Sequence, residues 1–239
     1  MGNLIYHKML NDQRITWLPR VYGELGLSFL AIGSYPAIVL LGMNMPYSMV
    51  NEEELPTYEA VVGRSFLDIP LGCDRFYDND SVLVSLLLHS LGRTLEEFAQ
   101  SVFDWITVAV ARAGVKTIKQ EDATKSLILN GKQVAGSYVS GVQAGFYFAG
   151  TIIRLDVNYT ANIALLKPPL NLVNKVIGIN QCDFDITVDN MVQKLEENFT
   201  TFLGETLVLT PISNIETQLN ELQTMYTTED WIKDATYPA

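Results

Sequence analysis

The chain has 239 residues, of which 48% are apolar and 18% charged, so it is not an intrinsically disordered protein and a sizeable core is expected. Its 16 basic and 27 acidic residues give a net charge of −11 with no run of Lys or Arg. This excludes a nonspecific nucleic-acid binder, which needs a basic surface. The length fits one large domain or two small ones, at about 150 residues per domain.

The N-terminal third contains two apolar segments that predict strands, at 26–32 and 37–41, with a turn at 33–36 between them. Glycines and a proline interrupt this stretch, so it is not a membrane span, which needs about 20 mostly unbroken apolar residues. The segments that follow predict a short acidic helix at 51–55, a short strand at 58–64, a loop at 67–80 and a buried strand at 81–88.

A helix is predicted from Thr94, whose hydroxyl suits the N-cap, with Glu96 and Glu97 at the positive end. Apolar residues recur at helical spacing until Gly114, which ends it. Downstream, the Asn-Gly pair at 130–131 predicts a β-hairpin, because both turn positions need positive φ. One or two more strands are expected over 144–156.

Two further helices are predicted near the C-terminus. Thr187 caps the first, and Gly204 ends it; Thr210 and Pro211 open the second. The elements together predict an α+β fold, with a mixed or antiparallel sheet packed with helices. We assign this domain to residues 1–209 and a C-terminal helical cap packed on it to residues 210–239.

Cysteine and histidine usage is sparse. Only Cys73 and Cys182 are present, far apart, which indicates a reducing compartment such as the cytoplasm rather than a disulfide framework. His7 and His89 stand alone, so no metal site is expected, because zinc sites need several closely spaced ligands.

Several segments resemble the biotin/lipoate protein ligase family, which includes the octanoyltransferases. NGKQVAGS at 130–137 is similar to the family hairpin NGKK-(V/I)-(S/A)-G-S, and GFYFAGTIIRLDV at 145–157 to the strand LQHGTILLDVD. GLSFLAIGSYPAIVLLG at 26–42 resembles the paired strands LRFYRWSPPAVSLGR. The helix at Thr187 and YTTEDWI at 226–232 resemble the closing LTP…KY-(S/T)-x-(D/E)-W.

The resemblance implies a biotin/lipoate ligase-like catalytic domain fold. It also implies an enzyme that activates lipoate, or a related acyl chain, as an adenylate and passes it to a lysine of a carrier domain. Some relatives instead move an octanoyl group between carrier proteins, with a cysteine or lysine in place of ATP.

The family's anion-binding loop, RRxSGGG-x-V-x-HD, is poorly matched. The corresponding stretch, 63–80, offers Arg64 and Gly72, and Tyr77-Asp78 stands in place of the His-Asp pair. Glycines let backbone amides approach a phosphate closely. The loss of the triple glycine therefore indicates a weakened anion site.

The catalytic lysine position of the family is occupied by Gln133, a neutral side chain that cannot stabilise the negative charge of an acyl-adenylate. Lys132 precedes it, and we expect it to point to the opposite face of the strand unless a β-bulge re-aims it. Ala149 replaces a histidine of the pattern, and Met43 an arginine.

The candidate catalytic residues are thus Gln133, Lys132 and Cys73, each with a plain alternative. Gln133 also fits an ordinary strand residue, Lys132 a solvated turn residue, and Cys73 a loop thiol that lacks an activating base. Phe146 and Phe148 fit either the core or an acyl tunnel. The candidate ligand-binding residues are Arg64, Gly72, Tyr77, Asp78, Gly136, Phe146, Phe148 and Gly150.

These losses predict a lipoate–protein ligase-like protein without adenylation or acyl-transfer chemistry, acting as a noncatalytic binding or scaffold protein with a protein partner. The alternative is an active lipoyl or octanoyl ligase or transferase that acts on a carrier-domain lysine through rearranged groups. A third, unrelated activity on a similar sheet is also compatible with the sequence. We expect no resident cofactor, with ATP and lipoate or octanoate only for the active alternative, and no nucleic-acid or membrane partner.

Overall fold

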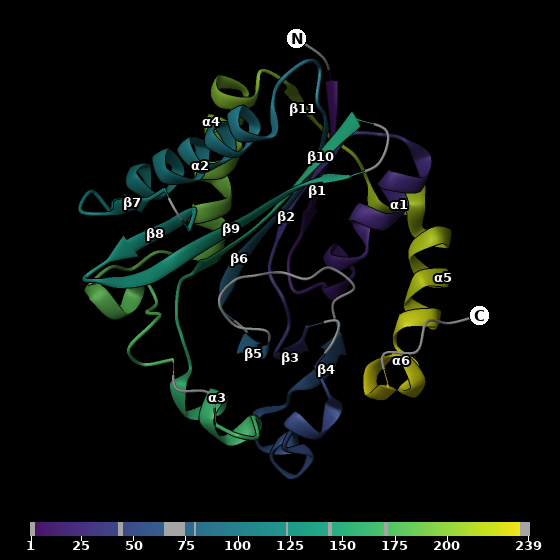
Figure 1. Ribbon diagram of the computed structural model, residues 1–239, viewed down its shortest axis with the longest axis vertical. Coiled ribbons are helices and arrows are strands. Elements are labelled where there is room, and N and C mark those ends of the chain that lie inside the picture. Colours follow the sequence, from purple (N-terminus) through teal and green to yellow (C-terminus); the bar gives the residue numbers. More distant parts are fainter. Residues whose placement is uncertain are drawn as a thin grey trace.

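The computed structural model describes residues 3–42, 45–64, 75–78, 80–122, 124–142, 145–169 and 172–234. Over these residues, eight strands form one mixed sheet and three form a second, smaller sheet (Figure 1). Helices cover both faces of the main sheet. The predicted α+β class with a mixed sheet is confirmed.

The main sheet has the strand order β11-β1-β2-β6-β10-β9-β8-β7. Strands β11, β1 and β2 run parallel, and the other neighbours are antiparallel. The strands are β1 Asn3–Met9, β2 Phe29–Gly33, β6 Ser81–His89, β7 Lys119–Glu121, β8 Ser126–Leu129, β9 Lys132–Val142, β10 Phe146–Arg154 and β11 Thr206–Leu209.

The second sheet has the order β4-β3-β5, with β3 at Ile38–Leu41, β4 at Val61–Arg64 and β5 at Arg75–Asp78. Strand β3 is parallel to β4 and antiparallel to β5. The expectation that 26–32 and 37–41 form paired strands is therefore wrong in its pairing. Strand β2 pairs with β1 and β6, and the chain then crosses to the other sheet.

Helices α2 (Leu95–Arg112) and α4 (Val188–Leu203) cover one face of the main sheet. Thr94 and Glu97 form a capping box at the start of α2, and Thr187 caps α4. The two helices pack on each other through Trp105, which is fully buried and donates its indole N–H to the Leu195 carbonyl at 2.8 Å.

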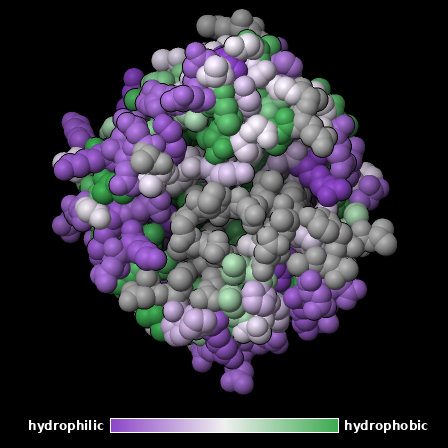
Figure 2. All heavy atoms as spheres, viewed as in Figure 1, coloured by the Kyte–Doolittle hydropathy of each residue, from purple (hydrophilic) through white to green (hydrophobic). Residues whose placement is uncertain are grey.

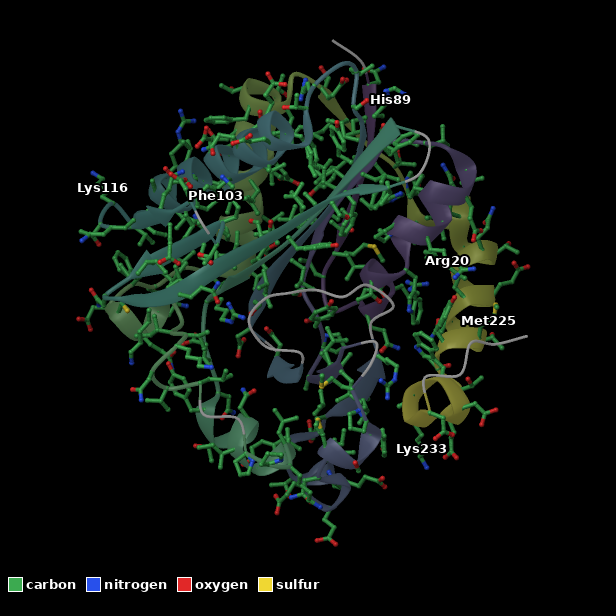
Figure 3. All side chains as sticks on the ribbon, in the orientation of Figure 1. Arg20, His89, Phe103, Lys116, Met225 and Lys233 are labelled. Atoms are coloured by element: carbon green, nitrogen blue, oxygen red, sulfur yellow. The ribbon has the colours of Figure 1, made fainter. Side chains whose placement is uncertain are left out.

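The other face of the main sheet is covered by α1 (Leu18–Leu25), α5 (Glu216–Tyr226), α6 (Glu229–Asp234) and the second sheet. Arg20 of α1 lies beside α5 (Figure 3) and donates to the Tyr226 hydroxyl at 2.6 Å. Helix α3 (Tyr159–Leu165) packs against the far side of β3. The C-terminal helices therefore lie on the body of the fold.

The hairpin predicted around the Asn-Gly pair at 130–131 is present as β8 and β9. Its turn residues Asn130 and Gly131 have φ of 51° and 76°, which is the positive-φ requirement that predicted it. The helices from Thr94 and Thr187 and the buried strand at 81–88 are likewise confirmed.

Other segments differ from the prediction. The acidic helix expected at 51–55 is one 3-10 turn, Glu52–Glu54. The last predicted helix begins as a 3-10 turn, Ile212–Ile215, before α5. Part of the loop predicted at 67–80 is strand β5, Arg75–Asp78. Strands β1, β7 and β11 and helices α1 and α3 have no counterpart in the prediction. For β1 and β11 the reason is that they are stabilised by parallel pairing between opposite ends of the chain.

The face seen in Figure 2 is mainly hydrophilic around its rim, with hydrophobic residues grouped towards the top, over the ends of β1 and β10. None of the helices in the described part of the chain is long and apolar enough to cross a membrane.

Candidate functional site

Three predicted ligand-binding residues, Gly136 of β9 and Phe148 and Gly150 of β10, lie on the sheet face opposite α2 and α4. Phe148, Gly150 and Ile152 alternate along β10, and Ile152 pairs with Gly136 of β9. Directly paired residues point to the same face. Phe148 and Ile152 belong to the apolar cluster that contains residues of α1 and β3. This face is therefore turned towards the second sheet.

Gln133 lies on the same face. It pairs with Ile128, two residues after Ser126, which pairs with Gly136. The Gln133 side-chain amide donates to the Ser126 hydroxyl at 2.7 Å, and its backbone exchanges 3.0 Å hydrogen bonds with Lys175 and Ile177. The side chain at the family's lysine position is thus neutral and held by a neighbouring strand.

Lys132 lies on the opposite face. It pairs with Leu129, which is buried in the cluster beneath α2. The register of β8 and β9 does shift, but the extra residue is Val134, which follows Gln133. The bulge therefore comes too late along β9 to bring Lys132 to the face of Gln133.

The space beside Gly150 is occupied by a phenylalanine. Phe148 is 4% exposed, and its ring lies 3.4 Å from the point where a Cβ on Gly150 would sit. The Tyr138 ring is next to it, with centroids 6.5 Å apart. Phe146 is half-buried and contacts the ring of His89 edge-on, at 5.1 Å.

Arg64 is buried, and its guanidinium bonds to backbone carbonyls. Nε and Nη2 donate to Ile232 at 3.0 and 2.7 Å, Nη2 also to Lys233, and Nη1 to Gly42 and Met45 at 3.1 and 2.6 Å. A cation at the C-terminal end of a helix satisfies its unpaired carbonyls. An anionic ligand at Arg64 would have to displace this contact with α6.

Asp78 is 7% exposed at the end of β5. It accepts from the Ser81 hydroxyl at 2.6 Å and from the Asp80 amide at 3.2 Å. Burial raises the pKa of Asp78 to about 6, against the opposing effects of the Ser81 bond and the Arg154 charge. The carboxyl is therefore poised to change charge near neutral pH.

Asp78 forms a buried cluster with Tyr35 and Arg154, whose charges or hydroxyl interact with it. Neither Tyr35 nor Arg154 is predicted from the sequence. Both are nearly fully buried, and burial together with the Asp78 charge raises the pKa of Tyr35. Arg154 pairs with Ser81 and lies, by alternation from Ile152, on the face of Gln133. The only sequence signal for Arg154 is that a single arginine ends an otherwise apolar strand. Its position near Asp78 follows from its pairing with Ser81 of β6, which the sequence does not predict.

The remaining predicted residues lie in the undescribed segments 43–44 and 65–74 or close to the second of them. Cys73 and Gly72 are outside the described residues, as is Met43. Tyr77 lies in β5, where its backbone pairs with Val39 of β3. Its side chain is outside the described part of the structure. Their roles stay predictions.

Among the described residues, no three His, Cys, Asp or Glu side chains come together as a candidate metal site. His7 is buried; its Nδ1 donates to the Thr210 carbonyl at 2.8 Å, and its Nε2 lies 2.5 Å from the Tyr22 hydroxyl. Burial lowers the pKa of His7, so it is a neutral core residue.

The mixed sheet, with two helices on one face and a three-stranded sheet on the other, is the fold of the lipoate–protein ligases. A bipartite lipoate protein ligase from Thermoplasma acidophilum superposes with a TM-score of 0.80 at 13% identity, over 100% of this chain and 99% of that one. A lipoate-protein ligase A bound with ATP gives 0.78 at 13% identity, over 99% and 100%.

A third structure, LipL1 of P. falciparum in complex with lipoate, gives a TM-score of 0.75 at 14% identity, over 98% of this chain and 75% of that one. No protein-family model and no curated protein matches the sequence. The likeness is therefore one of fold, and chemistry has to be argued from the residues.

Proposed function

We propose that this protein is a lipoate–protein ligase-like protein that has lost adenylation and acyl transfer and acts as a noncatalytic binding or scaffold protein. The fold supports the first half of the proposal. The second half rests on the residues of the sheet face, where the resemblance implies catalytic groups.

The observation that carries the proposal is the side chain at the family's lysine position. Gln133 is on the appropriate face but is uncharged and bonded to Ser126. The neighbouring Lys132 is on the other face of β9. A preorganised positive charge near the developing carboxylate and phosphate charges is usually the largest contribution to such catalysis.

Two further observations support the loss of chemistry. The guanidinium of Arg64 already bonds to carbonyls of α6 and of the segment after β3. The Phe148 ring lies over Gly150, on the face where an acyl chain is expected from the resemblance. We therefore propose that the acyl space is filled by side chains.

A lipoyl-type carrier domain is the first partner to test. The T. acidophilum ligase was described together with its E2 lipoyl domain. A noncatalytic protein on the same scaffold retains a surface for such a domain without the reaction.

The test combines turnover and binding. The protein is incubated with ATP, lipoate or octanoate, and an unmodified lipoyl domain, with an active lipoate–protein ligase as positive control. We expect no acylated carrier by mass spectrometry and a saturable carrier interaction by calorimetry. Acylation of the carrier that is lost in Lys132→Ala or Cys73→Ala establishes the active alternative instead, and absence of both turnover and binding contradicts the carrier partner.

A further inference from the structure

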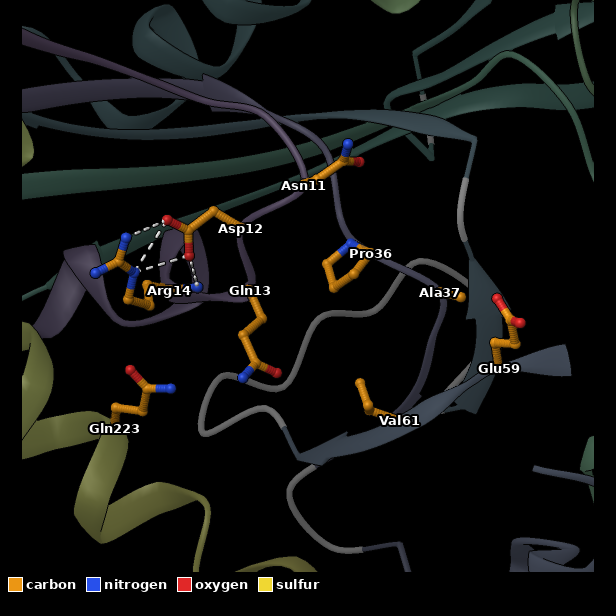
Figure 4. Close-up of a pocket in the computed structure, with 9 residues that line it drawn as sticks. All are labelled: Asn11, Asp12, Gln13, Arg14, Pro36, Ala37, Glu59, Val61 and Gln223. Atoms are coloured by element: carbon orange, nitrogen blue, oxygen red, sulfur yellow. Dashed lines mark hydrogen bonds and ion pairs between the residues drawn. The ribbon is translucent and has the colours of Figure 1, made fainter. Parts of the chain in front are cut away.

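A cavity and an open edge of the main sheet both lie apart from the sheet-face residues. The cavity has a volume of about 370 Å³. Figure 4 shows the carboxylate of Glu59 on the opposite side of it from the amides of Gln13 and Gln223. Another charged pair of the lining, Asp12 and Arg14, is joined by an ion pair of 2.7 Å. The polar groups of the cavity therefore do not converge on one ligand, whereas the sheet edge presents a regular set of hydrogen-bonding groups.

Among the described residues, the main sheet ends in two different edge strands, β7 and β11 (Figure 1). Strand β7 is Lys-Gln-Glu at 119–121; it is exposed along its length and carries a charge of each sign. Charged side chains on an edge strand oppose its pairing with another chain. Strand β11 is Thr-Leu-Val-Leu at 206–209 and contains no charged residue. The β11 edge therefore lacks the protection that β7 has.

The backbone groups of β11 point alternately to β1 and away from the sheet. The amide of Thr210 donates to the Tyr6 carbonyl at 2.8 Å, and the parallel register pairs Tyr6 with Leu209. In a parallel ladder of this phase, Val208 also bonds to β1, because alternate residues of a strand face the same neighbour. The N–H and C=O groups of Leu207 and Leu209 therefore point outward.

The side chains at this edge are apolar and largely exposed. Leu209 is 68% exposed, the highest value among the large hydrophobic side chains of the described residues, and Val208 is 43% exposed. Leu207 packs partly against the apolar cluster beneath α2 and α4, and Leu209 lies on the same face by alternation. Such an edge is complementary to another uncharged, apolar strand.

We propose that β11 pairs antiparallel with β11 of a second copy of this chain, across a two-fold axis at Val208. In this register Leu207 of each copy faces Leu209 of the other, and each such pair exchanges two hydrogen bonds through the outward groups. The two Val208 side chains meet at the axis, as in an isologous interface. Further along, Glu205 faces Pro211, which has no N–H, so the pairing ends there.

A second copy fits this edge because the contact is self-complementary. The residues that face each other are leucine and leucine, or the same valine, and no charged residue of β11 is placed against a like charge. The proposal goes beyond the proposed function and is independent of both carrier binding and acyl chemistry.

The first experiment is sedimentation equilibrium of the full-length protein from about 10 µM to about 1 mM. Strand β11 has only four residues, so the interface is small and we expect a dimer with a dissociation constant on the order of 100 µM. Val208→Lys places like charges opposite each other at the axis and is expected to weaken the dimer at least about tenfold. Gln120→Lys adds the same charge at β7 and is expected to leave the dimer unchanged. Both positions are exposed, so both variants are expected to fold.

Hydrogen exchange of the backbone amides, followed by NMR, tests the strand pairing itself. The amides of Leu207 and Leu209 are expected to exchange severalfold more slowly at the high end of the concentration range than at the low end, because they are bonded only in the dimer. The amides of Val208 and Thr210 bond to β1 in both states. Their exchange is therefore expected not to depend on protein concentration.

Three results overturn the proposal. One is a monomer over the whole concentration range, which leaves the edge open or available only to a strand of another protein. Another is a dimer that Val208→Lys and Gln120→Lys weaken equally, which identifies a nonspecific charge effect. The last is a dimer in which the amides of Leu207 and Leu209 gain no protection, which places the contact elsewhere on the surface.

Discussion

The amide of Gln133 donates to the hydroxyl of Ser126 at 2.7 Å across the β8–β9 pair. The position at which the resemblance implies a catalytic lysine is therefore occupied by a neutral side chain with a hydrogen-bond partner of its own.

Replacing Gln133 by lysine is expected not to restore adenylation. Lysine adds one charge on the appropriate face, but Arg64 stays bonded to α6, and catalytic groups that act as a unit are strongly non-additive. Loss of the Ser126 bond is expected to cost about 1 kcal/mol of folding free energy. Pyrophosphate release with ATP and lipoate measures the first effect and urea denaturation the second. The matched control is Lys132→Gln, for which we expect no change in pyrophosphate release or in stability to urea. ATP-dependent acyl transfer by Gln133→Lys contradicts the prediction.

Truncation of Arg64 is expected to loosen the C-terminal helices. Arg64→Ala leaves the carbonyls of Ile232, Gly42 and Met45 without their cationic donor, at a cost of about 2–4 kcal/mol. Urea unfolding followed by tryptophan fluorescence measures it, since Trp231 bonds to the Arg64 carbonyl. The exposed Arg112→Ala is expected to stay within about 0.5 kcal/mol. An equal loss of unfolding free energy in Arg64→Ala and Arg112→Ala contradicts this structural role of Arg64.

We expect the free energy of unfolding to decrease as pH rises, because Asp78 then ionises in its buried position. Its pKa is raised from 3.8 to about 6, so the folded state holds the proton more tightly than the unfolded state. The contribution is fully present below about pH 4 and lost as pH rises through 6, by about 3 kcal/mol in total. Asp78→Asn stays uncharged, so its stability relative to the unaltered protein should rise between pH 4 and 7. A flat or falling difference in unfolding free energy over that range contradicts the assignment.

Gly33 is expected to tolerate no side chain. A Cβ there would lie 1.9 Å from the Met9 carbonyl oxygen, because β1 and β2 are adjacent at this point. Gly33→Ala should therefore lose several kcal/mol, comparable to the severest single substitutions. Gly23→Ala, in α1 with nothing within 4 Å of its Cβ, should instead stabilise by about 0.5–1 kcal/mol. Thermal melting of both variants checks the pair, and a Gly33→Ala protein as stable as the parent rules out this strand packing.

Octanoate and lipoate are expected to leave the melting temperature of the protein unchanged, because the Phe148 ring occupies the space beside Gly150. Phe148→Ala should cost about 3 kcal/mol or more and open an apolar space, after which octanoate should raise the melting temperature. Phe146→Ala is the control on the same face, since Phe146 is only half-buried. A saturable rise with the unaltered protein shows an open acyl site.

The elements visible in the sequence are those whose signal is local. The capping box of Thr94 and Glu97 and the Asn-Gly turn at 130–131 need only neighbouring residues, and both are present. Strand β1 depends on β11, more than 190 positions away along the chain. No local sequence pattern therefore predicts strand β1.

The site residues also fall into two groups, those placed by a local sequence pattern and those placed by contacts between distant segments. The hairpin pattern places Gln133 and Gly136 correctly on β9, and alternation places Lys132 opposite. The role of Arg64 and the cluster of Tyr35, Asp78 and Arg154 depend on contacts between both sheets and the last helix. Such contacts are set by tertiary packing, which spacing along one strand does not encode.

The most direct test of the central claim is a measurement of adenylate formation. The purified protein is mixed with ATP and lipoate, and lipoyl-adenylate and pyrophosphate are quantified beside an active lipoate–protein ligase at equal concentration. The neutral Gln133 and the opposite facing of Lys132 predict no adenylate above the rate without protein. Adenylate that accumulates in proportion to protein concentration contradicts the account.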